Sequence, residues 1–293
     1  MKTRGVGAYL GLAVGDALGA TLEFMTPREI QAKYGTHDKI RGGGWLGLKP
    51  GQVTDDTTMS LALGRSILEA GRVDAMAAVL AFDNWMRAKP VDIGHTVRRG
   101  IVHFRLTGQS CVPENEYDAG NGACMRTLPV ALATLGRDAA LVRAASRAQA
   151  HVTHNNYLSD AAAECVIAMV QAAIGGATTN DLLSGAARDL VAEHPQFRFR
   201  GRRRDHPSAF IVETMQAVFQ ALFDTDTFEN CLIDVVNRGG DADTTGAIAG
   251  MIAGAVYGED AIPRRWLKKL DPAISDACRD QALALPARFP ALI

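Results

Sequence analysis

Residues 237–258, "NRGGDADTTGAIAGMIAGAVYG", combine a run of acids and threonines with a glycine at every fourth position. These glycines are Gly246, Gly250, Gly254 and Gly258, and residues four apart lie on the same face of an α-helix. Each glycine inside a helix costs about 1 kcal/mol relative to alanine. A compensating contact is therefore expected, and close backbone packing against another helix is the simplest one.

The N-terminal segment repeats this spacing, with glycine at positions 7, 11, 15 and 19. We expect the two glycine faces to pack against each other in antiparallel orientation. The end of the first helix would then lie beside the start of the second, with Glu23 next to Asp241 and Asp243. The alternative is a pair of merely weak helices, and it leaves the shared spacing without an explanation.

Helical periodicity covers most of the chain. Helices are predicted over "TPREIQAKYG", with Thr26 as N-cap, over "TDDTTMSLALGRSILEAG", ending at Gly71, and over "DAMAAVLAFDNWMRAKP", ending before Pro90. Two more segments, "LSDAAAECVIAMVQAAIGG" and "PSAFIVETMQAVFQALF", have apolar residues at helical spacing. The best strand candidate is the short "FRFR" at 197–200. We therefore predict an all-α fold of about a dozen helices.

Composition narrows the class of protein. A chain of 293 residues suits a single domain over 1–293, and a net charge of −1 gives no indication of nucleic-acid or anionic-membrane binding. Five cysteines without a CxxC motif favour reduced, mostly buried thiols and a cytoplasmic location. The first twenty residues resemble a signal peptide, but Asp16 and the frequent glycines argue against one. No apolar run reaches the roughly 20 residues of a transmembrane segment.

A second acidic cluster, "TDDTT", stands at the start of another predicted helix. Asp and Thr are good N-caps, but capping uses one side chain per helix. It leaves a pair of acids in each cluster unexplained, namely Asp55 with Asp56 and Asp241 with Asp243. Together with Glu23 these would be five carboxylates in one pocket, which repel one another unless cations neutralise them. Oxygen ligands favour Mg²⁺ or Mn²⁺, and five acids indicate two ions rather than one.

The chain resembles the ADP-ribosylglycohydrolase family in several stretches, which occur in the expected order over residues 5–258. They are "GLAVGDALGATLEF", "GGGWLGLKPGQVTDDTTMSLALGRSI", "DAGNGACMRTLPVAL", "THNNYLSDAA" and "NRGGDADTTGAIAGMIAGAVYG". The resemblance is strongest to the branch that removes ADP-ribose from an arginine of dinitrogenase reductase, the nitrogenase iron protein. It implies a compact all-α fold and a centre of two divalent cations, Mn²⁺ or Mg²⁺.

The resemblance also implies site residues. It places the metal ligands on Thr54, Asp55, Asp56, Asp241, Asp243 and Thr244, with Glu23 beside them. It places ADP-ribose contacts on Gly120, Asn121, Gly122, Met125, His154 and Phe210. On their own, the "GNG" would be a turn and the histidine a structural residue. Relatives often have a ligand-contacting tyrosine where this chain has Phe210, so a hydroxyl contact is absent there.

Asp92, in "KPVDIGHTVRRG", has two interpretations. By itself it is a candidate N-cap for the helix that follows. The resemblance instead implies a functional acid near the reacting ribose. If cations occupy the other carboxylates, Asp92 remains free to move a proton. Glu23 competes with it for the activation of water, so both are candidate catalytic acids.

The predicted reaction is hydrolysis of the N-glycosidic bond between ADP-ribose and a protein arginine. The alternatives are hydrolysis of ADP-ribosyl-serine or O-acetyl-ADP-ribose, and a non-catalytic ADP-ribose-binding protein. The expected partner is an ADP-ribosylated protein, dinitrogenase reductase on the resemblance, and not a nucleic acid. The resemblance also suggests control by a PII nitrogen-signalling protein, with peripheral membrane association through it. We expect a monomer. The arginine-rich "RFRGRRRDHP" is either a solvated loop or a docking patch for an acidic protein.

Overall fold

The computed structural model describes residues 2–288, so residues 1 and 289–293 of the predicted 1–293 domain lie outside it. The fold is all-α, as predicted, and in the described residues the only extended pairings are two isolated bridges. The helices are α1 (Lys2–Gly19), α2 (Pro27–Tyr34), α3 (Asp55–Ala70), α4 (Ala75–Arg87), α5 (His95–Thr107), α6 (Leu128–Ala133), α7 (Ala139–Ala150), α8 (Tyr157–Ile174), α9 (Thr179–Leu182), α10 (Arg188–Glu193), α11 (Ile211–Asp224), α12 (Phe228–Val236), α13 (Ala242–Tyr257), α14 (Arg264–Leu267) and α15 (Pro272–Arg288).

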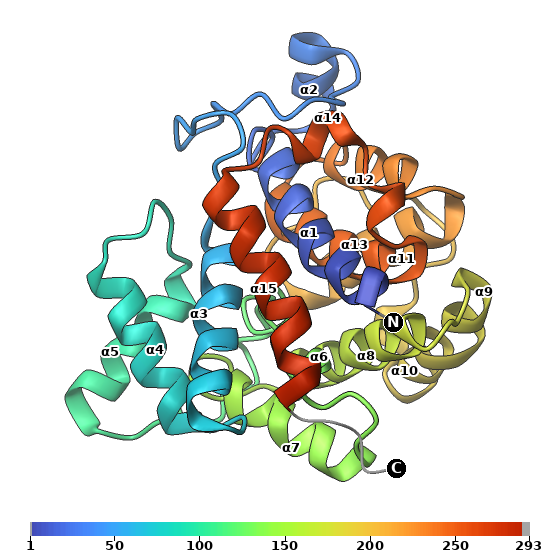
Figure 1. Cartoon of the computed structure of the whole chain (residues 1–293). Helices are drawn as coiled ribbons and strands as arrows, with labels where there is room; N and C mark the ends of the chain where they lie inside the picture. The colour runs from blue at the N-terminus through green and yellow to red at the C-terminus, as the bar shows by residue number, and fades with distance from the viewer. Residues whose placement is uncertain (1, 289–293) are drawn as a thin grey trace.

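Helices α1 and α13 lie side by side at the centre of the molecule (Figure 1). Helices α3, α8, α11, α12 and α15 pack around this pair, and α4 and α5 lie at one edge. Every residue of α1 from Gly5 to Gly19 is buried, and so is every residue of α13 from Ala242 to Ala255. A helix that is apolar all round belongs in a core, which explains why neither segment shows an amphipathic pattern.

The two glycine faces are in direct backbone contact. A methyl group at Gly11 would lie 2.2 Å from the carbonyl oxygen of Gly250, far inside van der Waals distance. At Gly15 it would lie 2.0 Å from the carbonyl oxygen of Gly246. Residue numbers rise along one helix as they fall along the other, so the pair is antiparallel. The predicted packing of these faces is confirmed.

Gly258 does not lie inside the helix, although the glycine repeat continues to it. A methyl group at Gly7 would meet the carbonyl oxygen of Gly254 and the carbonyl carbon of Gly258, where α13 ends. Gly258 instead ends the helix with a φ of 80°, a conformation that glycine adopts without strain. At the other end, Gly19 lies against the backbone of Ala242. The register therefore brings the end of α1 directly onto the first turn of α13.

Local sequence signals set the other helix ends as predicted. Thr26 caps α2 in a reciprocal capping box with Glu29. Helix α3 ends at Gly71 in the left-handed conformation, and α4 ends at Arg87, before Pro90.

The best strand candidate, "FRFR", does not form a strand. Phe197 and Phe199 are buried and Arg198 and Arg200 are exposed, so the alternation is real. However, side chains of α11 take the place of a partner strand. Gln216 donates a hydrogen bond to the carbonyl of Arg198, and Gln220 donates one to that of Phe199. Alternating burial predicts a strand only where a second extended segment is available.

Helix α8 passes a length and composition test for a transmembrane segment, with a hydropathy of 1.3 over 18 residues. However, 67% of this window is buried inside the fold, as expected of a core helix. The predicted state of the thiols is confirmed, because all five cysteines are free and only Cys111 is exposed.

We predict that Gly11→Ala destabilises the protein by about 1–3 kcal/mol, because the methyl group overpacks the α1–α13 contact. Gly5→Ala is the matched control in the same helix, since its methyl group would meet no atom closer than 3.7 Å. That change should be neutral or stabilise by up to about 1 kcal/mol through helix propensity. Denaturant unfolding of both variants gives the comparison, and equal free energies of unfolding would contradict the proposed role of the contact.

Candidate active site

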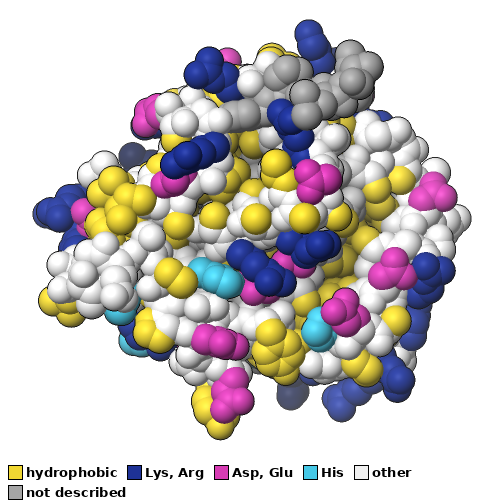
Figure 2. Space-filling model, turned by 90° about the horizontal axis from the view of Figure 1, so that it is seen from below, with side chains coloured by type: hydrophobic (Ala, Val, Ile, Leu, Met, Phe, Trp, Pro, Cys, Tyr) yellow, Lys and Arg dark blue, Asp and Glu magenta, His cyan; other side chains and the backbone are white. Residues whose placement is uncertain are grey.

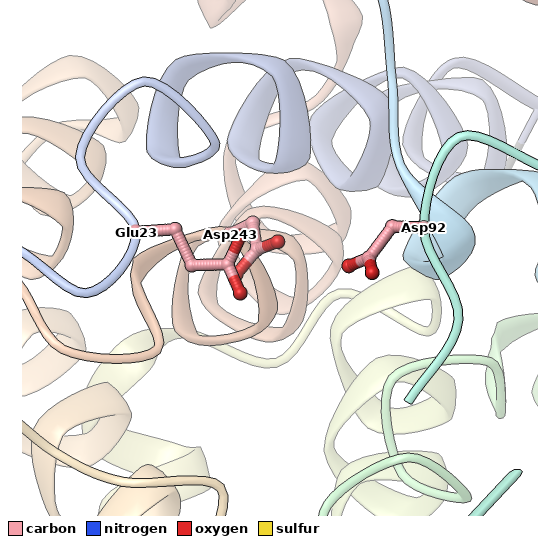
Figure 3. Close-up of side chains that lie close together, drawn as sticks. All are labelled: Glu23, Asp92 and Asp243. Carbon is pink, nitrogen blue, oxygen red and sulfur yellow. The ribbon is translucent and has the colours of Figure 1, made fainter. Parts of the chain in front are cut away.

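Three chain segments bring carboxylates together where α1 ends. Glu23 lies in the turn after α1, Asp55 and Asp56 begin α3, and Asp241 and Asp243 flank the start of α13. The antiparallel register of α1 and α13 accounts for the first and last of these positions. The predicted neighbourhood of Glu23 with Asp241 and Asp243 is confirmed, and Figure 3 shows Glu23 beside Asp243.

A fourth segment, between α4 and α5, contributes Asp92. In Figure 3 its carboxylate faces those of Glu23 and Asp243, and one oxygen of each lies within 4.8 Å of the others. The N-cap of α5 is Gly94, while the Asp92 carboxylate accepts a hydrogen bond from the backbone N–H of Ile93 at 2.7 Å. The interpretation of Asp92 as a helix cap is therefore wrong, and its side chain is part of the acidic cluster.

These carboxylates face a cavity of about 500 Å³. The predicted site residues that line it are Glu23, Asp55, Asp92, Gly120, Asn121, Gly122, Met125, His154, Asp241, Asp243 and Thr244. Three others do not. Thr54 and Asp56 are fully buried beside Asp55. The Phe210 side chain is 42% exposed outside the lining, and its backbone forms a bridge with Gly120.

The acidic clusters do not cap their helices. Thr54 and Asp241 occupy the N-cap positions of α3 and α13, but neither side chain makes a capping hydrogen bond. The Thr54 hydroxyl oxygen instead lies 3.0 Å from an Asp16 oxygen and 3.1 Å from an Asp56 oxygen. Asp241 accepts a hydrogen bond from the Asn121 amide at 2.6 Å. Capping therefore does not explain these residues, whose polar atoms point into the cluster.

Asp16 is a structural carboxylate beside the site that was not among the predicted site residues. It projects from α1 and accepts hydrogen bonds from the backbone N–H groups of Thr54 and Thr57, and from the Thr57 hydroxyl. Asp16 thus fixes the first turn of α3 against α1. The sequence feature that could have identified it is that Asp16 is the single acid in an otherwise apolar helix, because a buried charge requires partners.

Burial raises the pKa of every carboxyl group in the cluster, and neighbouring carboxylates raise most of them further. The pKa of Glu23 rises to about 8 and that of Asp55 to about 7. Those of Asp56 and Asp243 lie well above the ordinary value, and that of Asp92 is also raised. Like charges in a water-poor site disfavour ionisation of all members at once.

The acidic charge has no basic counterpart in the cavity lining, which contains neither lysine nor arginine. Furthermore, one oxygen of Asp56 is buried without a hydrogen-bond partner among the described residues. Buried carboxylate oxygens are normally paired, so this atom is available to coordinate a cation. A set of Asp, Glu and Thr oxygens fits hard divalent cations such as Mg²⁺ and Mn²⁺.

The loop from Gly120 to Met125 also lines the cavity, and its role in ligand contacts stays a prediction. Asn121 bridges this loop to the rest of the site, donating hydrogen bonds to Asp241 and to the Thr214 hydroxyl. His154 also lines the cavity and is buried, and burial lowers its pKa to about 3. Its imidazole is therefore neutral at physiological pH.

Trp45 was also missed, although it lies in the quoted "GGGWLG". The glycines of this segment have positive φ angles and form a tight loop that only glycine builds without strain. The indole N–H of Trp45 donates a hydrogen bond to Glu23, and its ring lies 5.3 Å from that of Phe24. This bond stabilises the ionised form of Glu23 and opposes the effect of burial on its pKa.

A larger cavity of about 700 Å³ lies between α7, α8 and α10. Figure 2 looks onto the molecule from below, where basic and acidic side chains lie next to each other. The charges in this cavity are largely paired, with Arg147 at 2.9 Å from Glu164 and His151 at 2.9 Å from Asp160. Because the close cluster of carboxylates faces the smaller cavity, that cavity is the candidate active site.

Comparisons with known proteins agree with this assignment. A family model described as ADP-ribosylglycohydrolase matches residues 1–292. The chain is 54% identical to the ADP-ribosyl-[dinitrogen reductase] glycohydrolase of Rhodospirillum rubrum, over 97% of this chain and 96% of that protein. It is 33% identical to the ADP-ribosylarginine hydrolase Tri1 of Serratia proteamaculans (strain 568), over 90% and 74%. A solved structure described as an ADP-ribosylglycohydrolase-related protein complex superposes with a TM-score of 0.87, at 32% identity and 99% coverage of both chains.

We predict that the metal-free protein loses stability as the pH rises from about 4.5 to about 8. The pKa of Glu23 is raised from 4.5 to about 8 in the folded state, so protonation favours folding below this window and the benefit is lost above it. In chelator, the melting temperature should therefore fall between pH 6 and pH 8.5. Mn²⁺ should raise the melting temperature most at the higher pH, because cations replace the protons. Melting temperatures that respond to neither pH nor Mn²⁺ would contradict this description of the cluster.

Proposed function

The chain belongs to the ADP-ribosylglycohydrolase family, and we propose that it hydrolyses the N-glycosidic bond between ADP-ribose and an arginine side chain of a protein. The observation that carries the proposal is the cavity itself. Closely spaced carboxylates line it, together with the loop from Gly120 to Met125, for which the family resemblance implies ADP-ribose binding. Two of the relatives described above are named for hydrolysis at ADP-ribosylated arginine or dinitrogen reductase.

We propose that two divalent cations, Mn²⁺ or Mg²⁺, occupy the acidic cluster. The unpartnered oxygen of Asp56 and the absence of lysine and arginine from the lining support this assignment. The residues that would hold them are Thr54, Asp55, Asp56, Asp241, Asp243 and Thr244. When bound, such cations lower the pKa of a coordinated water and stabilise charge that develops in the transition state.

The chain itself must supply proton transfer. Hydrolysis joins the oxygen of water to the anomeric carbon of the ribose, breaks the carbon–nitrogen bond and delivers a proton to the departing guanidine. Asp92 is the best-placed group, since it comes from a loop of its own and its only hydrogen bond in the described structure is to the N–H of Ile93. Its carboxyl group can pair with the guanidine or carry its proton. Glu23, held by Trp45, is the competing candidate for activation of water.

We extend the proposal to dinitrogenase reductase as the target, because the relative that shares 54% of its residues is named for that substrate. Hydrolysis of this adduct would return the modified arginine to its free form and reactivate the target. Control by a PII protein, a monomeric state and a cytoplasmic location stay predictions from the sequence.

We predict that chelator abolishes release of ADP-ribose from arginine-modified dinitrogenase reductase and that Mn²⁺ restores it. The same assay with serine-linked ADP-ribose tests the alternative substrate, and we expect little release from it. Full activity in a metal-stripped sample would contradict the cation assignment. Equal release from both linkages would contradict the assignment to arginine.

We predict that Asp92→Asn lowers the rate at which ADP-ribose is released from the modified arginine by about 10²- to 10⁴-fold, the usual effect of losing a positioned acid–base group. Asparagine keeps the size of the side chain and its acceptor for Ile93, so the melting temperature should change little. Asp74→Asn is the matched control, because Asp74 is a true N-cap that accepts from the N–H of Ala77. It should keep the full rate, since asparagine also caps well. A normal rate for Asp92→Asn would transfer the role to Glu23.

A further inference from the structure

His154 lies in a space that only glycine neighbours can leave open. A methyl group at Gly120 would lie 2.9 Å from its Nε2, and one at Gly122 would lie 2.8 Å from its Cε1. Gly120 and Gly122, in the loop that lines the cavity, therefore pack closely against the His154 ring. Its Nε2 has no hydrogen-bond partner among the described residues, although His154 lines the cavity.

The other ring nitrogen of His154 is engaged. The Thr153 hydroxyl oxygen lies 2.8 Å from Nδ1, and the same oxygen accepts a hydrogen bond from Nη2 of Arg126 at 2.8 Å. A guanidinium group can donate hydrogen bonds but cannot accept them. The hydrogen bond between Arg126 and Thr153 therefore has a fixed direction, with Arg126 as the donor.

This direction fixes the tautomer of His154. The Thr153 hydroxyl has one hydrogen, and Nδ1 of His154 is the only acceptor within reach of it among the described residues. If Nδ1 carried the proton instead, two donors would point at the same oxygen and the buried hydroxyl hydrogen would have no acceptor. An unmet buried donor costs about 1–3 kcal/mol, so the network places the imidazole proton on Nε2.

Arg126 is an unusually rigid anchor for this chain. It is completely buried, its Nε donates to the side-chain oxygen of Gln149, and Nη2 also donates to the Gln149 carbonyl. Its guanidinium lies 4.5 Å from the centre of the Phe82 ring. Burial lowers its pKa, but only to about 9, so the group remains charged at neutral pH.

We propose that Arg126 and Thr153 are positioning residues that fix His154 in the Nε2–H tautomer, so that Nε2–H donates a hydrogen bond to an oxygen of bound ADP-ribose. The ligand half of this inference rests on the proposed function, while the tautomer half does not. Through these hydrogen bonds, the buried charged group of Arg126 holds His154 as a neutral hydrogen-bond donor that faces the cavity. A neutral donor serves a sugar or phosphate oxygen without attracting the nearby carboxylates.

The tautomer can be measured in the ligand-free protein from the nitrogen chemical shifts of ¹⁵N-labelled histidine. We expect the His154 signals of an Nε2–H tautomer, with Nδ1 unprotonated. Thr153→Val keeps the shape of the side chain but removes the hydroxyl, and should give a mixture of tautomers or the Nδ1–H form. Thr153→Ser restores the hydroxyl and should restore the tautomer. His151, paired with Asp160, is an internal reference that none of these changes should move.

Calorimetric titration with ADP-ribose tests the second half. Thr153→Val should weaken binding by about two- to tenfold, the range for one hydrogen bond, and Thr153→Ser should bind as the wild type does. An Nδ1–H tautomer in the wild type would overturn the proposal, and so would a Thr153→Val variant with unchanged tautomer and affinity. An Nε2–H wild type that fails to bind ADP-ribose at any concentration would instead overturn the proposed function, because the tautomer is read without ligand.

Discussion

The backbone contact between α1 and α13 is the constraint on which the rest of the structure depends. Glycine lets the carbonyl of one helix reach the Cα of the other, as at Gly11 and Gly250, and so fixes both their distance and their register. The register then determines that the turn carrying Glu23 meets the first turn of α13, which carries Asp243. The packing of two largely apolar helices thus positions the acidic cluster.

Helix α1 also sets the position of the third acidic segment. Asp16 stands next to Gly15 in the sequence, and its carboxylate holds the N–H groups of Thr54 and Thr57 at the start of α3. One helix therefore provides both the packing face for α13 and the polar anchor for α3. The carboxylates that result lie close together, and no lysine or arginine lines the cavity that they face. Such an arrangement conflicts with stability and is typical of a functional site.

The sequence predicted those features that depend on regular spacing. The glycine repeat predicted the antiparallel pair, and the surplus of acids over capping positions predicted the cluster. It did not predict contacts between distant segments. Asp16 and Trp45 act through partners that only the folded chain brings close, and the position of Asp16 as a lone acid in an apolar helix does not reveal which partners these are. The alternation in "FRFR" has a similar explanation, since Gln216 and Gln220 take the place of a partner strand.

Two sets of groups in the cavity lining differ in hydrogen-bonding character, and this difference bears on how the proposed ligands bind. Ionised carboxylates offer acceptors, whereas His154 in the inferred tautomer offers a donor at Nε2. At a pH high enough to ionise Glu23 and Asp243, these groups would repel a pyrophosphate group as long as no cation neutralises them. Bound cations would remove that repulsion, and a bound anion would in turn favour the cations. On the proposed function, cation and ADP-ribose binding must therefore strengthen each other by the same factor, since linkage between two sites is reciprocal.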